Sequence, residues 1–426
     1  FVLLHLETNK HNMELITYLQ PIKREAIDFL EGDFGVCLGS KTATYWEGEA
    51  FPDLNNVSLA MIGVCEDRGT VDNSGCALAP DAIRRKLYRL SVPCDDMTLA
   101  DLGNIVPGRT TEDTLFAVTD VVYQLLHRNV TVIILGGGQD ITLAQYKAYE
   151  RLGRVVNITA IDSRFDLENS EQVTSQSYLS HIVRQDPNFL FNFTNIGYQS
   201  YFVDRQMVML LDDLQFDAYR LGVIKDNMRR AETLIRATDL LTVDLGAVRQ
   251  SDCPAVGNPS PHGFYGEDLC LLTRYAGMSD KLTSIGFYEL NPRYDNRYQS
   301  AQMVAHSLWY FIEGFFHRYH DFPYRDPENY RRYLVTLNPT EITYDSDQSS
   351  IGKDAFHADL RCTEIVFIKS KKSSRWWMEV PCEMDDQRER YAHHLLVPCT
   401  KEEYDEAVEG RLPDLWMKYY SRVNSL

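Results

Sequence analysis

The stretch VTVIILGGGQDITLAQYKAYE, residues 130–150, decides how the rest of the chain is interpreted. A β-branched apolar run meets three glycines, then Gln139 and Asp140, and then a pattern typical of a helix. No Gly-Lys-Ser/Thr follows the glycines and the spacing G-x-G-x-x-G is absent, so neither a P-loop nor a dinucleotide fingerprint is present. We interpret the glycines as a tight turn at a strand end that presents the next side chains to a cleft.

Further apolar runs of strand length recur along the chain, at residues 57–64, 155–162, 193–198, 239–246 and 282–290. Runs that are apolar on both faces are typical of parallel strands covered by helices on each side. Helical patterns lie between them, at residues 79–90, 111–129 and 300–319. The alternation predicts an α/β fold with a three-layer, doubly wound, mostly parallel sheet.

Three segments differ in character: an N-terminal helix and loop segment (1–50), the α/β domain (51–325) and a small mixed α/β C-terminal extension (326–426). In the extension, residues 362–382 predict a β-hairpin with a polar turn. Thr400 and Glu403 predict a capping box at the start of a helix. The adjacent Trp376 and Trp377 are expected in the hairpin core and as a cross-strand partner, with an exposed binding surface as the alternative.

Composition excludes several classes of function. The net charge of −18 argues against binding to nucleic acid, which needs a basic face, and against docking on an anionic membrane. No apolar run approaches the roughly 18 residues needed to span a bilayer. The nine cysteines are scattered without a C-x-x-C pair, which predicts reduced thiols in a cytoplasmic protein.

Polar residues follow several of the predicted strands. Asp162, Arg164 and Asp166 lie at spacing i, i+2, i+4, so all three project from one face if the segment is extended. Asp244 ends a later strand, and Gln139 follows the glycine turn. Converging carboxylates repel one another, so they usually hold a divalent cation or an arginine. We therefore expect an ion or a guanidinium at this edge of the sheet.

The order of these segments resembles that of the arginase superfamily of ureohydrolases, which includes agmatinase and formimidoylglutamase. The resemblance covers residues 57–320 and is carried by IGVCEDRGTVDNSGCALAPDAIRRKL (62–87), DLGNI (101–105), LGGGQD (135–140), IDSRFD (161–166), TVDLG (242–246), NPSPHGFYGED (258–268) and FYELNP (287–292). It implies an arginase-type sheet, and relatives that commonly form homo-oligomers. It also implies hydrolysis of guanidinium or amidine groups by a hydroxide that bridges two manganese ions, whose charge lowers the pKa of bound water.

The resemblance also places the metal ligands. Three positions keep their carboxylates: Asp162, Asp166 and Asp244. Gln139 stands where a histidine binds the first metal, Arg164 replaces the histidine of the second, and Gly246 replaces an aspartate of the second. The resemblance therefore implies a degenerate metal site, in which the second position is dismantled.

Arg164 has no lone pair for a metal and stays protonated. We expect its guanidinium to fork onto the carboxylates and neutralise them without an ion. Repulsion between two cations at about 4 Å amounts to several kcal/mol even at an effective dielectric near 20, which would exclude the second metal. Gln139 offers a carbonyl oxygen, a poor ligand for manganese but acceptable to magnesium or calcium. We expect no bound metal; the alternative is a single divalent ion (Mn, Mg or Ca).

Two further residues are candidates for catalysis through the resemblance. It puts Glu267 near the family's substrate-binding glutamate, although Glu267 could equally be a surface acid. It puts His181 where the family has a general-acid histidine, but His181 lies in a helical pattern without the glycine that usually follows. A structural histidine is the alternative there.

Three hypotheses of function follow. The first is an arginase-fold protein that has lost binuclear manganese catalysis and binds a small guanidinium- or amidine-type ligand or a protein partner. The second is an active C–N hydrolase of linear amidines with an altered or single-metal site. The third is an interaction scaffold that works through the hairpin and its tryptophan pair.

Overall fold

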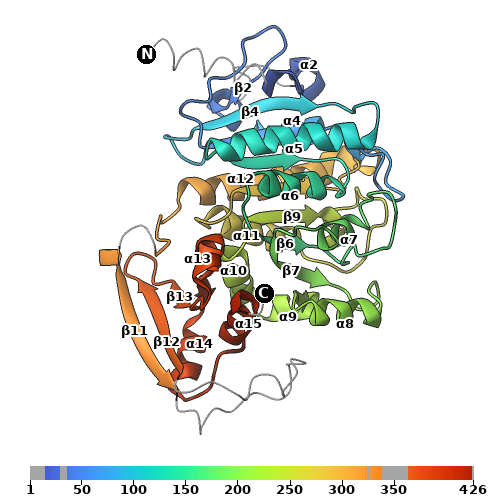
Figure 1. Cartoon of the computed structure of the whole chain (residues 1–426). Helices are drawn as coiled ribbons and strands as arrows, with labels where there is room; N and C mark the ends of the chain where they lie inside the picture. Colours follow the sequence, from blue (N-terminus) through green and yellow to red (C-terminus); the bar gives the residue numbers. More distant parts are fainter. Residues whose placement is uncertain (1–14, 29–35, 324–326, 338–362, 425–426) are drawn as a thin grey trace. The chain divides into compact units, whose positions relative to one another are not determined.

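The computed structural model describes residues 15–28, 36–323, 327–337 and 363–424 (Figure 1). They form two compact units, which are described separately. The first comprises the residues up to Met209 together with Phe216–His317, and the second comprises Leu210–Gln215 and the residues from Arg318 onward.

The first unit is built on a ten-stranded sheet with the order β1-β4-β3-β5-β10-β9-β6-β7-β8, and β2 pairs with β4. Its strands are β1 (Leu19–Gln20), β2 (Ala43–Thr44), β3 (Leu59–Val64), β4 (Leu99–Ile105), β5 (Thr131–Leu135), β6 (Val156–Ile161), β7 (Leu190–Tyr198), β8 (Asp217–Arg220), β9 (Leu240–Asp244) and β10 (Ser284–Tyr288). The β1–β4 pair is antiparallel and the others are parallel. The predicted mostly parallel sheet is confirmed.

Helices cover both faces of this sheet, so the predicted three-layer α/β class is confirmed. Helices α5, α6 and α7 follow one another along one face, and α4, α12, α11 and α10 along the other (Figure 1). The helices are α2 (Arg24–Ile27), α3 (Leu38–Lys41), α4 (Ala79–Leu87), α5 (Thr111–His127), α6 (Ile141–Arg151), α7 (Tyr178–Val183), α8 (Arg205–Asp213), α9 (Leu221–Asp226), α10 (Met228–Arg236), α11 (Gly266–Gly277) and α12 (Gln299–Phe316). Among the described residues, no helix is both long and apolar enough to cross a membrane.

The apolar runs of the central strands form the core. All five residues of β5 are buried, because helices cover the strand on each side. Ile133 and Leu135 of this strand share a buried cluster with residues of α4, α11 and α12, such as Ile83, Leu272 and Leu308. Burial of these apolar groups is the main force that holds the helices on the sheet.

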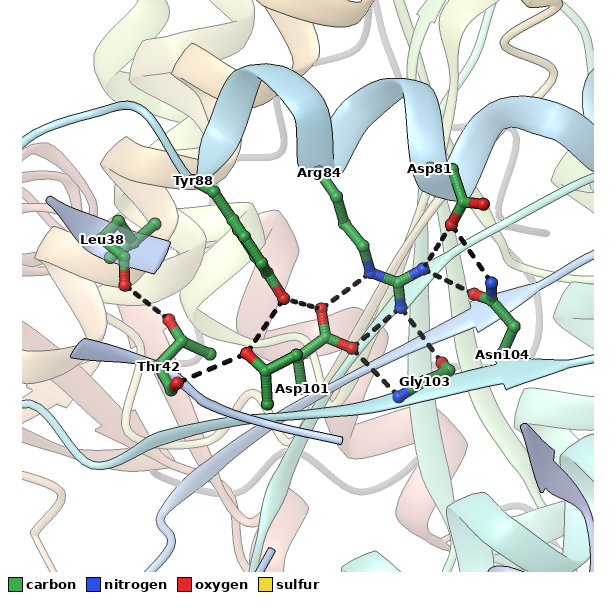
Figure 2. Close-up of polar contacts among 9 residues, drawn as sticks. Leu38, Thr42, Asp81, Arg84, Tyr88, Asp101, Gly103 and Asn104 are labelled. Carbon is green, nitrogen blue, oxygen red and sulfur yellow. Dashed lines mark hydrogen bonds and ion pairs between the residues drawn. The ribbon is translucent and has the colours of Figure 1, made fainter. Parts of the chain in front are cut away.

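Strand β4 was not among the predicted strands, because Asp101 and Asn104 interrupt its apolar pattern. Arg84 of α4 satisfies both (Figure 2). Its Nε donates to Asp101 Oδ2 at 2.7 Å and its Nη2 to Asp101 Oδ1 at 2.8 Å, and both side chains are completely buried. The Tyr88 hydroxyl donates to Asp101 Oδ2 at 2.7 Å, and Arg84 Nη2 also donates to the carbonyl oxygen of Gly103. The buried salt bridge between Arg84 and Asp101 therefore joins α4 to β4 and satisfies the polar residues within that strand.

The N-terminal segment was expected as a helix and a loop. Its described residues contain α2 and α3, and also the short strands β1 and β2, which both pair with β4. Two-residue strands are too short to show a pattern in the sequence, which is why they were not predicted.

The second unit carries a four-stranded antiparallel sheet with the order β11-β12-β13-β14. Its elements are β11 (Tyr330–Leu337), β12 (Thr363–Ser370), β13 (Trp376–Glu379), α13 (Asp385–Tyr391), β14 (Leu396–Cys399), α14 (Lys401–Val408) and α15 (Asp414–Asn424). The predicted hairpin corresponds to β12 and β13, and the capping box of Thr400 and Glu403 begins α14. Trp376 and Trp377 are 8% and 2% exposed, so the pair is part of the core and not an exposed binding surface.

Candidate functional site

The glycine turn after β5 is held against the two neighbouring strands. Gly138 N donates to the carbonyl oxygen of Glu66, which follows β3, at 3.0 Å. Glu289 N, which follows β10, donates to the carbonyl oxygen of Gly137 at 2.9 Å. A Cβ on Gly137 would lie 1.7 Å from the oxygen of Glu66, so only glycine permits this approach. The turn places Gln139, which is completely buried, at the carboxyl edge of the sheet.

Four acidic side chains gather at this edge: Asp162, Asp166, Asp244 and Glu289. We call them the carboxylate cluster. Asp162, Asp166 and Glu289 are buried, and Asp244 is partly exposed. Burial raises the pKa of Asp162 above its ordinary value. Burial and the nearby Asp162 carboxylate raise the pKa of Asp166 and of Asp244 well above the ordinary range. A cation placed here would be favoured, because it would relieve this repulsion.

Glu289 is the member that the sequence interpretation missed. Burial raises its pKa to about 7, even though its carboxylate accepts hydrogen bonds from Asn73 Nδ2 at 2.7 Å and from Gln139 N at 3.0 Å. Its φ of 67° is strained for a residue with a side chain, and such strain concentrates at functional sites. The signal in the sequence was the same as for Asp244, an acid at the end of a buried strand at the sheet's carboxyl edge.

Arg164 does not occupy the carboxylate cluster, so the prediction that its guanidinium forks onto the three aspartates is wrong. Its Cζ lies 4.4 Å from the centre of the Phe202 ring, and among the described residues no carboxylate oxygen lies within salt-bridge distance of it. Its charge still acts on the acids at longer range, because it lowers the pKa of Asp162 and of Asp244. The segment is bent and not extended, since Arg164 N donates to Asp162 Oδ1 at 2.8 Å and Asp166 has a φ of 52°. In this bent segment the guanidinium lies over the Phe202 ring and does not reach the carboxylates of Asp162 and Asp166 with a hydrogen bond.

Several oxygen atoms of the site lack a hydrogen-bond partner in the part of the chain that the structure describes: Gln139 Oε1, Asp162 Oδ2 and Asp166 Oδ2. Gln139 Nε2 makes long contacts, at 3.4 Å to Thr242 Oγ1 and 3.5 Å to the Tyr178 hydroxyl, and the Gln139 side chain also donates a hydrogen bond to the Asp162 carboxyl. Buried polar atoms are normally paired with protein groups or with ordered water, so these oxygens are available to a water, an ion or a ligand.

Asp140 is a second buried acid that the sequence interpretation did not single out. Its carboxylate lies 2.2 Å from where a Cβ on Gly138 or on Gly69 would stand, so it fills the space that both glycines leave. Burial and the charges of Glu289 and Glu66 raise its pKa to about 8, and neither of its oxygens has a hydrogen-bond partner among the described residues. The turn therefore adds, beside the carboxylate cluster, a buried carboxyl that is mostly protonated at neutral pH.

Two of the positions that the resemblance assigns to a second manganese ion lack a side-chain donor atom. Gly246 has no side chain and the Arg164 guanidinium has no lone pair, so two of the positions that would hold the second ion offer no donor. Within the described ranges, no group of three or more His, Cys, Asp or Glu side chains is arranged to hold a metal ion.

Gly246 nevertheless leaves room. A Cβ there would meet only the Asp244 carboxylate, whose nearest oxygen lies 3.0 Å away, and the glycine is not at a positive φ. Gly246 N donates to Asp244 Oδ1 at 2.6 Å and begins a short 3-10 turn, Leu245–Ala247. A side chain could therefore be added at this position with little change in the backbone.

The two candidates for catalysis lie elsewhere. Glu267 is exposed in the first turn of α11, near Arg249, and none of the described hydrogen bonds or ion pairs joins it to the carboxylate cluster. His181 lies in α7 and is partly buried. In that helix it is Tyr178, and not His181, that contacts Gln139. The roles of Glu267 and His181 stay predictions.

Comparison with known proteins agrees with this arrangement of motifs. A family model described as the arginase family matches residues 57–313. The chain belongs to the arginase family. This confirms the resemblance seen in the sequence and the arginase type of the sheet.

Curated relatives of this arginase-family chain include formimidoylglutamases. The one from Enterobacter sp. (strain 638) is 27% identical over 271 residues, which cover 60% of this chain and 85% of the relative. The one from Staphylococcus aureus (strain MRSA252) is 24% identical over 291 residues, which cover 64% of this chain and 94% of the relative. The similarity supports membership of the ureohydrolases.

Solved structures show the same fold. Trypanosoma cruzi formiminoglutamase with Mn2+2 superposes with a TM-score of 0.59 at 21% identity, covering 62% of this chain and 96% of that one. Formimidoylglutamase from Bacillus subtilis gives a TM-score of 0.60 at 18% identity, covering 68% of this chain and 95% of that one. At these identities the likeness establishes the fold of the arginase-family unit alone.

Proposed function

We propose that this arginase-family protein binds the cationic group of a small guanidinium- or amidine-type ligand in the carboxylate cluster, and that it does not operate a binuclear manganese centre. The observation that carries the proposal is the close pair of buried carboxyls, Asp162 and Asp166, whose Oδ2 atoms accept no hydrogen bond from another described residue. Arg164 and Gly246, at positions that the resemblance assigns to metal ligands, offer no side-chain donor atom to a metal. The proposal favours a small ligand over a protein partner, because most of the cluster is buried.

An amidinium or guanidinium suits such a site chemically. Its planar N–H groups donate to carboxylates in pairs, and its charge offsets the repulsion among the acids. Asp244 is the partly exposed member of the carboxylate cluster, so it marks the side from which a ligand would enter. Gly246 is also partly exposed and lies close to Asp244. Because it has no side chain, it does not obstruct the entry of a ligand there.

Glu289 and Glu267 provide a matched pair for testing where the cation binds. We expect Glu289→Gln to weaken binding of agmatine by about tenfold to a hundredfold, the value of a hydrogen bond to a charged group. Glu267→Gln, at an exposed position, should leave the affinity within about twofold, as is usual for exposed charges. Isothermal titration calorimetry on the two variants and the unchanged protein measures both effects. An equal loss in both variants, or no binding by the unchanged protein, would contradict the proposal.

A second candidate is an active hydrolase of linear amidines with one divalent ion. The same unpartnered atoms favour it, because Gln139 Oε1, Asp162 Oδ2 and Asp166 Oδ2 are hard oxygen donors of the kind that magnesium and calcium prefer. The curated formimidoylglutamases among the relatives also favour it.

Back-substitution separates the two candidates. We expect the unchanged protein, incubated with excess Mn²⁺ and then freed of unbound ion, to retain fewer than two manganese ions per chain. The triple variant Gln139→His, Arg164→His, Gly246→Asp should retain more, because it restores donors at all three positions. Metal content is measured by plasma mass spectrometry. The control is the double variant Gln139→His, Arg164→His, which keeps Gly246. Two tightly held ions in the unchanged protein, or its turnover of formiminoglutamate, would favour the hydrolase.

A further inference from the structure

Strand β11 is the outer strand of the antiparallel sheet in the second unit (Figure 1). It pairs with β12 along its whole length, from Tyr330 opposite Ser370 to Leu337 opposite Thr363, without a shift in register. Among the described residues no strand pairs with its other side. Its sequence, YRRYLVTL, contains neither proline nor glycine. β11 is therefore a long and regular edge strand, of the kind that most proteins shorten, bend or cover.

The register shows which backbone groups of β11 point away from β12. Lys371 N donates to the carbonyl oxygen of Asn329 at 2.8 Å, so this facing pair is joined by a hydrogen bond. Facing pairs alternate between bonded and non-bonded along an antiparallel ladder, so the odd-numbered residues of β11 bond to β12. The N–H and C=O groups of Arg332, Leu334 and Thr336 therefore point to the open edge. All three residues are exposed.

The side chains along this edge define what can pair with it. Leu334, the middle of the three open positions, is 60% exposed. Arg331 and Arg332 lie at one end of the strand, and the other end is uncharged. Arg332 Nη2 lies 2.6 Å from Glu379 Oε2 of the same sheet, so its charge is partly offset. A matching strand is therefore extended, apolar at its centre, and uncharged opposite the arginines. β11 itself meets these conditions when it runs in the opposite direction.

We propose that β11 pairs antiparallel with β11 of a second copy of this chain, about a twofold axis at Leu334, and so joins two four-stranded sheets into one. Leu334 then faces Leu334 of the other copy, and Arg332 faces Thr336. These facing pairs exchange about six backbone hydrogen bonds. A parallel arrangement would instead place arginine against arginine. The contact is isologous, as closed dimers require.

This surface is independent of the proposed ligand site. β11 lies beyond residues 57–313, which match the arginase family, so the contact belongs to the C-terminal extension. A single pair of edge strands buries a small area, and interfaces at the low end of the size range are weak. The association is therefore expected to depend on protein concentration.

Sedimentation velocity of the full chain over a wide range of concentration tests the proposal. Leu334 N is not part of the ladder with β12, so Leu334→Pro removes a bond to the second copy and leaves β11 in its own sheet. We expect it to raise the dissociation constant by at least about tenfold. Leu334→Lys keeps the backbone N–H but brings two ammonium groups together, and should do the same. The matched control is Val408→Lys in α14, where Val408 is 58% exposed, and it should change nothing.

Cross-linking tests the register. In the proposed dimer the two Leu334 Cα atoms lie about 5.5 Å apart, within the range of a disulfide, so Leu334→Cys should form a covalent dimer on mild oxidation. The two Thr336 Cα atoms would lie about 13 Å apart, so Thr336→Cys should not. The unchanged protein shows the background from its native cysteines.

The outcomes decide the proposal in both directions. A weaker association in both Leu334 variants but not in Val408→Lys, together with selective cross-linking of Leu334→Cys, supports it. A circular dichroism spectrum and urea midpoint like those of the unchanged protein show that each variant is folded, and Leu334→Lys keeps the test valid if Leu334→Pro is not. A full chain that stays monomeric at every concentration refutes the proposal. So does an association that neither Leu334 variant weakens, or equal cross-linking of Leu334→Cys and Thr336→Cys.

Discussion

Asp101→Asn is expected to lower the free energy of unfolding by about 3–5 kcal/mol, the usual cost of removing one partner from a buried ion pair. The guanidinium of Arg84 is completely buried, and Asp101 binds it through both carboxylate oxygens (Figure 2). An asparagine of the same size would leave the positive charge without its anion and would also disturb the hydrogen bond from Tyr88. The loss would loosen α4 from β4.

Urea unfolding, followed by circular dichroism, measures this effect as a shift in the midpoint at an unchanged slope. The control is Glu47→Gln, which breaks an ion pair with Lys23 whose side chains are 58% and 64% exposed, and should cost no more than about 1 kcal/mol. The double variant Arg84→Met, Asp101→Leu should recover much of the loss, because it leaves no fully buried charge unpaired; Asp81, the other partner of Arg84, is 38% exposed. A cost for Asp101→Asn as small as that of Glu47→Gln would refute the argument.

Gly137→Ala is expected to destabilise the first unit by more than about 3 kcal/mol, beyond the usual cost of an added methyl in a packed core. The new Cβ would lie 1.7 Å from the carbonyl oxygen of Glu66 and 2.7 Å from its carbonyl carbon. Glu66 cannot easily yield, because its carboxylate is bound by the side chain of Arg68 and by the Thr114 hydroxyl. The strands β3 and β5 would have to separate at the edge that carries the site.

Gly222→Ala is the matched control, since a Cβ on Gly222 would meet nothing within 4 Å and the residue lies in α9. There the higher helix propensity of alanine should make the change neutral or stabilising by up to about 1 kcal/mol. Thermal and urea unfolding of the two variants, side by side, give the comparison. Equal stability of the two would show that the turn can relax around a side chain.

The strands that the sequence predicted are those that bury apolar residues on both faces. Residues 130–137 and 282–290 correspond to β5 and β10, at the centre of the sheet. Strand β4 was missed for a physical reason: its polar residues are satisfied by Arg84, which lies in another element. Pairing between distant residues leaves no periodic signal along the chain.

The sequence predicted which residues lie at the candidate site better than it predicted where their side chains point. Gln139, Asp162, Asp166 and Asp244 follow strand ends, and the topology of a parallel sheet brings strand ends together. The direction of Arg164 could not be predicted, because it depends on a bend that a hydrogen bond to Asp162 produces within the segment. Spacing along a chain gives the direction of a side chain only where the backbone is regular.

Gly246 is a position at which evolution could restore an acidic side chain to the site. The residue lies two positions after Asp244, which ends β9, its φ is not positive, and the atoms nearest to an added Cβ belong to the Asp244 carboxylate. A lineage carrying this fold could therefore regain an acid there by one substitution without rebuilding the sheet. The closely fitted Gly137, in contrast, is fixed by the fold itself, and we expect it to persist whether descendants hydrolyse a ligand or only bind it.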